Sequence, residues 1–177
     1  MAEFPKQFAF PDPLPVISTS SPAALLGGMN YTGTALSATW PTSNLAIFVP
    51  FILTRPYIVT NLFCINGATA SGNIDIGIYS EDGTRLVSKG STAQAGTNTT
   101  QNLSVTSTEL GAGLFYLALA CNNTTATFNR YSTAANTHGA YGTAQMASAF
   151  ALPATATFAT TGQSYIPIVG LTGRSVL

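Results

Sequence analysis

The stretch that decides the fold is NIDIGIYSEDGTRLVSKG, residues 73–90. Ile74, Ile76 and Ile78 alternate with other residues, and this period of two is typical of a β-strand with one face in a core. The tip, SEDGT, places Gly83 where a three-residue hairpin loop with a bulge needs a left-handed residue. The stretch therefore predicts a β-hairpin.

The same stretch holds three of the six acidic residues of the chain, so it is either a carboxylate site or a decorated hairpin. The expected register pairs Ser80 with Thr84, Ile78 with Leu86, Tyr79 with Arg85, and Asp75 with Lys89. The last two pairs would face solvent as a cation–π contact and a salt bridge, each worth roughly 0.2–1 kcal/mol. At the tip, Glu81 and Asp82 would lie in water, where neither burial nor a like charge prepares a carboxylate for acid–base catalysis. We therefore expect a structural hairpin.

Charged residues make up 7% of the 177 residues, and six basic residues balance six acidic ones. A globular protein usually has roughly a quarter. A chain without a basic stripe does not favour binding to nucleic acid. A surface of neutral polar residues dissolves poorly as a free monomer, so we expect an assembly, such as a homo-oligomer and for example a trimer. The apolar residues 45–65 are interrupted by Pro50, Arg55 and Pro56, which predicts two strands rather than a membrane span.

Short strands at regular spacing extend outward from the hairpin. They are expected at residues 45–53, 57–65, 73–80, 84–90, 101–107, 114–122, 125–132 and 164–171. Such spacing predicts an all-β fold, an antiparallel β-sandwich or jelly roll, in a single domain over residues 31–177. Residues 137–153 would form one short helix or a long loop, and residues 114–122 a central strand. The expected core includes Ile74, Ile76, Ile78, Leu86, Leu117 and Leu119.

Residues 1–30 are expected to form an extended N-terminal arm, since the first 22 residues hold five prolines. Its apolar side chains are Phe4, Phe8, Phe10, Leu14, Val16 and Ile17. An arm of this composition needs a surface to lie on, and we expect that surface on a neighbouring subunit or shell.

Few residues suggest chemistry. Cys64 and Cys121 each end an apolar run and are expected to be buried reduced thiols, with a disulfide as the alternative. The single His138 cannot build a Cys/His metal site with them. Nucleophile-elbow and phosphate-loop motifs are absent. We therefore predict no catalytic residues, metal or cofactor; a glycosidase pair of Asp75 and Glu109 stays open, although nothing favours it.

Aromatic residues offer one further kind of site. Trp40, Tyr131 and Tyr141 could form a stacking platform for a glycan, since a ring face packs against the apolar face of a sugar. The alternative is that these side chains pack in the core or at subunit contacts.

Three segments carry a resemblance to a known family. They are SGNIDIGIYSEDGTRLVSKGSTAQAGTN at residues 71–98, LGAGLFYLALACNNTTATF at residues 110–128 and YIPIVGL at residues 165–171. Their pattern of strands and turns resembles a β-sandwich found in structural proteins of tailed bacteriophages, over roughly residues 45–170. The resemblance implies a virion surface component, and no catalytic residues carry over from it. The N-terminal arm lies outside the match.

We therefore expect a non-enzymatic virion protein, assembled in the host cytoplasm, and in particular a head decoration or cement protein. Its partners would be the major capsid protein or other virion subunits, with no nucleic acid and no membrane. The alternative is a tail or fibre subunit whose β-sandwich binds a host glycan. A β-sandwich enzyme acting on polysaccharide is a third class.

Overall fold

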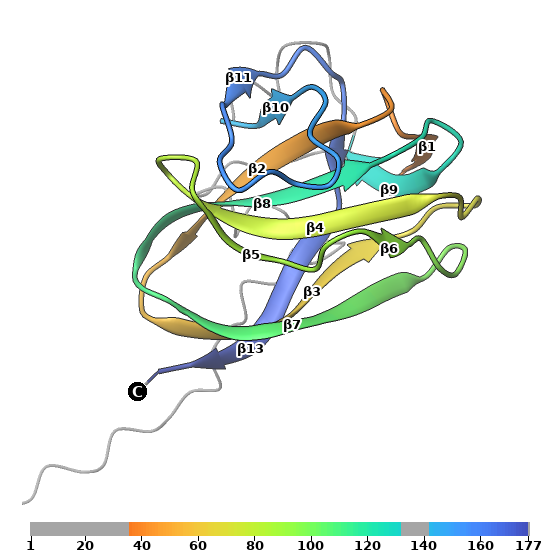
Figure 1. Ribbon diagram of the computed structural model, residues 1–177. Coiled ribbons are helices and arrows are strands. Elements are labelled where there is room, and N and C mark those ends of the chain that lie inside the picture. Colours follow the sequence, from red (N-terminus) through yellow and green to blue (C-terminus); the bar gives the residue numbers. More distant parts are fainter. Residues whose placement is uncertain (1–35, 132–141, 177) are drawn as a thin grey trace, which may run out of the picture.

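The computed structural model describes residues 36–131 and 142–176, and in these ranges the regular structure is all β (Figure 1). The strands are β1 (Leu36–Thr39), β2 (Leu45–Leu53), β3 (Tyr57–Ile65), β4 (Asn73–Ser80), β5 (Arg85–Ser88), β6 (Thr92–Ala93), β7 (Thr100–Leu110), β8 (Gly113–Cys121), β9 (Thr127–Tyr131), β10 (Ala144–Met146), β11 (Ala159–Thr160), β12 (Ile166–Pro167) and β13 (Val169–Ser175). The N-terminal arm with its apolar side chains, His138 and Tyr141 lie outside the described residues.

The strands form two layers of antiparallel sheet. The larger sheet has the order β11-β10-β2-β8-β4-β5, with β6 also paired to β4. The opposite layer holds β1-β9-β12 and β13-β3-β7, which the consecutive strands β12 and β13 connect. The main apolar core lies between the layers, with side chains from both. This arrangement is consistent with the predicted β-sandwich.

Strand β8 lies in the middle of the larger sheet, as predicted for residues 114–122. Leu117 pairs with Val49 of β2 and with Ile78 of β4. Five of the six predicted core side chains, all except Leu86, are fully buried. The alternation of apolar residues therefore correctly identified the inner face of this sheet.

The prediction for Leu86 is wrong, because its side chain is 39% exposed. Val87, rather than Leu86, pairs with Ile78, while Arg85 keeps its expected place opposite Tyr79. A β-bulge between these pairs accounts for the difference. One extra residue in a strand moves the following side chains to the other face, so Val87 enters the core.

The apolar residues 45–65 form two strands, as predicted, and the expected bounds of β2, β3 and β4 agree with the structure. Among the described residues, no helix is long and apolar enough to cross a membrane. The short helix considered within residues 137–153 is not found in the part that the structure describes. Residues 144–146 instead form β10, which pairs with β2.

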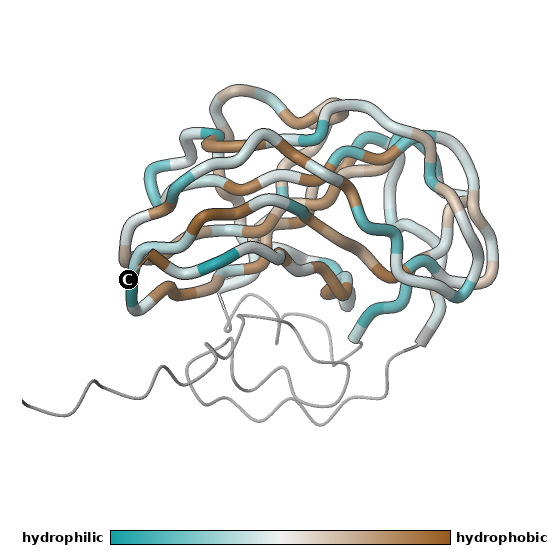
Figure 2. The backbone as a smooth tube through the Cα atoms, turned by 90° about the horizontal axis from the view of Figure 1, so that it is seen from below, coloured by the Kyte–Doolittle hydropathy of each residue, from teal (hydrophilic) through white to brown (hydrophobic). Residues whose placement is uncertain are grey.

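The outer face of the larger sheet is also covered. Residues 142–163, here called the cover segment, include β10 and β11 and lie over this face (Figure 1). A second apolar cluster forms between them, and its buried members are Ala46, Phe48, Tyr79, Ala118, Ala120, Ala144, Ala149, Leu152 and Ala156. In Figure 2 the most hydrophobic segments follow the strands, whereas hydrophilic segments are common in the connecting loops. The larger sheet is therefore buried on both faces along much of its length.

Candidate functional site

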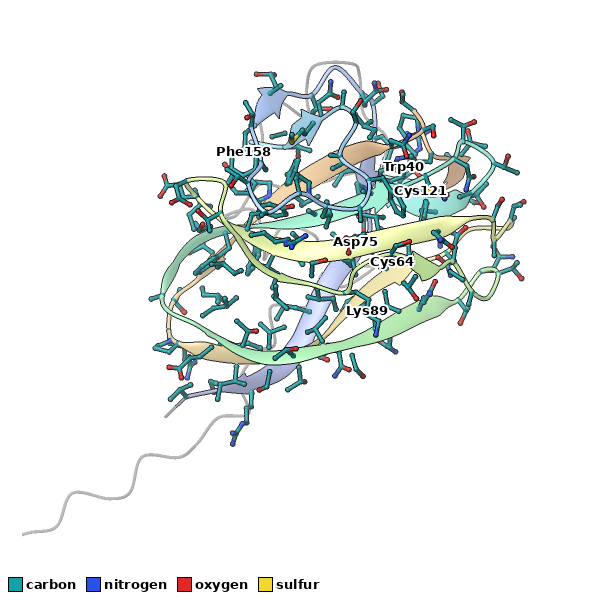
Figure 3. The ribbon with its side chains drawn as sticks, viewed as in Figure 1. Trp40, Cys64, Asp75, Lys89, Cys121 and Phe158 are labelled. Carbon is teal, nitrogen blue, oxygen red and sulfur yellow. The ribbon has the colours of Figure 1, made fainter. Side chains whose placement is uncertain are left out.

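Asp75 is the buried carboxylate of the described chain and the first candidate for chemistry. It lies on β4 between Ile74 and Ile76, so its side chain points to the outer face of the larger sheet. The cover segment closes over this position, and Asp75 is 0% exposed (Figure 3). The prediction that Asp75 faces solvent is therefore wrong.

The carboxylate of Asp75 accepts hydrogen bonds from three groups. The hydroxyl of Ser88 donates to Oδ1 at 2.8 Å, and the backbone N–H of Gly90 donates to the same oxygen at 2.9 Å. The backbone N–H of Leu152 donates to Oδ2 at 3.0 Å. One side chain thus joins β4, the segment after β5, and the cover segment.

Burial raises the pKa of Asp75, and the donors from Ser88, Leu152 and Gly90 act in the opposite direction, as does the charge of Arg85. The predicted salt bridge with Lys89 is wrong. The Nζ atom of Lys89 donates instead to the carbonyl oxygen of Ser104, 3.2 Å away on β7. The hydrogen bonds of Asp75 thus serve to position backbone, and no substrate is needed to explain them.

The cover segment has further anchors on the same hairpin. The hydroxyl of Tyr79 donates to the carbonyl oxygen of Pro153 at 2.6 Å, and the guanidinium of Arg85 donates to the carbonyl oxygen of Leu152. The backbone N–H of Arg85 donates to Ala154 at 2.9 Å. Tyr79 and Arg85 are therefore opposite each other, as predicted, but they bind the cover segment rather than facing solvent.

The hairpin tip matches its prediction. Glu81 and Asp82 are exposed, and Gly83 has a φ of 86°, the left-handed conformation expected there. The hydroxyl of Ser80 donates to Asp82 at 2.5 Å and the backbone N–H of Thr84 donates to it at 3.0 Å. These hydrogen bonds lower the pKa of Asp82. The tip carboxylates therefore order a turn in water.

The glycosidase pair that the sequence left open is not formed. Glu109 is exposed on β7, where it pairs with Ile58 of the opposite layer. Asp75 points away from that layer, under the cover segment. Two carboxylates on either side of a scissile bond must share one cleft, and these two do not.

The proposed glycan platform is wrong for Trp40 and Tyr131, since both are buried. Trp40 is 1% exposed, and its Nε1–H donates to the carbonyl oxygen of Leu45 at 3.1 Å. Its ring makes edge-on contacts with Phe128 and Tyr165, at centroid distances of 5.3 and 5.4 Å. These rings fill the core, and Tyr141 lies outside the described residues.

Sequence reasoning missed a buried amide network at one end of the two layers. The Nδ2 atom of Asn66 donates to the carbonyl oxygen of Ala95 at 2.7 Å and to Oε1 of Gln101 at 3.0 Å. Gln94 donates to Oδ1 of Asn66 at 3.1 Å. Only the Asn66–Gly67 pair after a predicted strand hinted at a turn here. The network stiffens the loops between strands, because each amide is held from two sides.

The two cysteines are free and buried, as predicted. Burial, with a smaller contribution from Cys121, raises the pKa of Cys64 to about 12. Within residues 36–131 and 142–176, no group of three His, Cys, Asp or Glu side chains is placed to hold a metal ion.

No protein-family model, curated protein or solved structure matches this chain.

Proposed function

We propose that this protein is a non-enzymatic structural component of a tailed-bacteriophage virion. In this proposal it is a head decoration or cement protein that binds the capsid shell through its N-terminal arm. The fold would be a jelly-roll variant of the β-sandwich, and the protein would act as a homo-oligomer, for example a trimer, in contact with the major capsid protein. It would reside in the virion, without binding nucleic acid or membrane.

The use of Asp75 is the observation that carries the proposal. In an acid–base enzyme, a buried carboxylate is presented to substrate in a cleft. Here the carboxylate binds Ser88, Gly90 and Leu152 and thereby holds the cover segment against the sheet. Polar groups at the other end of the layers, such as Asn66, likewise bind loops. Such internal bracing suits a rigid subunit that acts through its surface.

Two further features support the proposal. The segments that carry the resemblance to phage proteins form β4 to β8 and the start of β9, together with β12 and the start of β13, so they account for central parts of both layers. The near-absence of net charge suits a surface that neighbouring subunits cover, because such a surface has little charge to keep it apart from copies of itself.

The arm gives the proposal its mode of attachment. Burying each of its six apolar side chains contributes roughly 1.5–3 kcal/mol before ordering is counted. Ordering an extended chain costs about 1–2 kcal/mol per residue, and less where proline already restricts it. The balance is close, so a stable attachment needs a sizeable receiving surface on another subunit.

The test is incorporation of arm variants into phage particles. Deletion of residues 1–22 should leave a folded β protein by circular dichroism but abolish its incorporation. A matched variant keeps the length and the prolines and replaces the six apolar arm residues by Ser; it should fail in the same way. Wild-type occupancy of either variant would show that the arm is not the anchor.

Immunogold labelling and cryo-electron microscopy of particles give the location. Density over the capsid lattice is expected for a decoration protein. Labelling confined to the tail, together with binding to immobilised host glycans, would overturn the head assignment and favour the tail or fibre alternative. Loss of polysaccharide in the presence of the purified protein would overturn the non-enzymatic assignment.

A further inference from the structure

The two cysteines come from strands in opposite layers. Cys64 is on β3, and Cys121 is the last residue of β8 (Figure 3). Both are 0% exposed, and both belong to the apolar core that lies between the layers. Each side chain therefore points toward the opposite layer.

The surroundings place the two thiols at one end of this core. Cys121 pairs with Leu45, whose carbonyl oxygen accepts the hydrogen bond from Trp40. Trp40 in turn contacts the ring of Tyr165. The pKa of Tyr165 is raised, mainly by burial, and both Cys121 and Cys64 contribute to the rise. Both thiols are thus neighbours of one ring.

We propose that Cys64 and Cys121 are a redox pair that closes a disulfide between the two layers when the chain folds in an oxidising medium. This proposal is independent of the proposed function. The reduced, free state seen in the structure is then one of two states that the same core accepts.

The chemistry balances with a low-molecular-weight disulfide as the oxidant. One cysteine thiolate attacks a sulfur of oxidised glutathione, forms a mixed disulfide and releases one glutathione thiolate. The second cysteine thiolate then attacks the protein sulfur of that mixed disulfide and releases the other glutathione. Two protein thiols are oxidised, one glutathione disulfide is reduced, and the two thiol protons end on the two glutathione molecules.

Burial controls when this reaction occurs. Only the thiolate attacks a disulfide, and burial of both thiols disfavours it. In the folded protein the reaction therefore requires local opening of the layers, so the native reduced chain should oxidise slowly. During folding, both thiols are accessible before the core closes, and the disulfide should form readily.

Geometry makes the proposal testable. A disulfide needs Cα atoms about 4.4–6.8 Å apart, whereas packed sheets usually lie about 10 Å apart. Immunoglobulin-type sandwiches meet this requirement with an inter-sheet disulfide that packs against a buried Trp. Trp40 lies next to this pair in a comparable way. The disulfide would thus have to be compatible with the fold as it stands.

The experiment compares three forms of the full-length protein. One is refolded under reducing conditions, the second is refolded in a glutathione redox buffer, and the third is oxidised while unfolded and then refolded without reductant. Non-reducing intact-mass analysis and peptide mapping detect the Cys64–Cys121 disulfide. The Cys64→Ala and Cys121→Ala variants are matched controls that cannot form it.

We expect the second and third forms to carry the intramolecular disulfide and to have the same circular dichroism spectrum as the reduced form. Their apparent melting temperature should be higher by roughly 5–15 °C, because the bond restricts the unfolded chain. The two variants should show no such shift between oxidising and reducing buffer. If the pre-oxidised chain does not refold while the reduced chain does, or if the disulfide lowers the melting temperature, the proposal is wrong. Formation of only mixed disulfides in the redox buffer would also overturn it.

Discussion

Two aspartates of the same β-hairpin have opposite environments. Asp82 is exposed at the hairpin tip, and Asp75 is fully buried near the start of its first strand. Both accept hydrogen bonds from a serine hydroxyl and from backbone N–H groups. The pKa of Asp82 is lowered by these bonds, whereas the pKa of Asp75 is raised by burial in spite of them.

The difference comes from a segment distant in sequence. The donors to Asp82, Ser80 and Thr84, are its near neighbours. One donor to Asp75 is Leu152, which is 77 residues away on the cover segment. A turn carboxylate is thus explained by local geometry, whereas the role of Asp75 depends on what the rest of the chain places over the sheet.

The largest expected effect is the loss of the buried carboxylate. Asp75→Ala should lower the free energy of unfolding by about 2–4 kcal/mol, because the N–H groups of Gly90 and Leu152 lose their acceptor in a buried site. Urea unfolding curves measure the change. Asp82→Ala is the control, since it removes a similar set of bonds at the exposed tip and should have a much smaller effect. Equal losses in the two variants would contradict the contrast between base and tip.

A second prediction concerns tip geometry rather than tip charge. Gly83 has a positive φ, and an added Cβ would lie 2.3 Å from the carbonyl oxygen of Ala156. Gly83→Ala should therefore destabilise by roughly 1–3 kcal/mol. Gly90→Ala is the matched control, because Gly90 also has a positive φ but has open space around the added Cβ; its loss should be smaller, about 1 kcal/mol. A loss at Gly90 as large as that at Gly83 would mean that contact with the cover segment is unimportant.

The pKa shifts predict opposite pH dependences. The folded-state pKa of Asp75 is raised, so its contribution to stability is fully present below its ordinary pKa of 3.8 and is lost as pH rises through the folded-state value. The folded-state pKa of Asp82 is lowered, so its contribution is present above the ordinary value and is lost as pH falls through the folded-state value.

Unfolding free energies from about pH 3 to pH 7 for wild type, Asp75→Asn and Asp82→Asn test these signs. The difference between wild type and Asp75→Asn should rise in favour of wild type as pH falls. The difference between wild type and Asp82→Asn should fall over the lower part of the range. Two difference curves with the same slope would be inconsistent with the assigned environments.

The smallest effect is expected from the tip carboxylates together. The double change Glu81→Ala and Asp82→Ala should leave folding intact, since an exposed turn loses little. Under the proposed function, incorporation into particles should also stay at the wild-type level. Occupancy measured by quantitative gel analysis of purified particles checks this, and loss of incorporation by a folded double variant would return the tip to consideration as a binding site.

Most of the strands could be predicted from the sequence, because alternation and turn residues are local signals. Strands β2, β3 and β4 have the expected bounds, and Gly83 has the expected conformation. The position of Leu86 could not be predicted, because a single-residue bulge leaves no clear trace in composition. The short strand β10 was also missed, since three residues are too few to show a period.

The candidate site was less predictable than the fold. The carboxylate of Asp75 was identified, but its environment was assigned to solvent. Trp40 was considered as a ligand platform, although its indole N–H and ring are bound within the core. An aromatic or charged residue has the same one-letter signal in either place, so its partners must be known before its role can be assigned.

The sequence by itself determined that the chain forms β-structure, which face of β4 carries the isoleucines, and where the hairpin turns. These properties depend on backbone preference and on a period of two, and both are local. Only the tertiary structure decided that the other face of β4 is also buried. Alternation distinguishes the two faces of a strand, but burial depends on whether a distant segment covers a face. Here residues 142–163 do so, and they convert Asp75 from an expected surface charge into the buried anchor of the cover segment.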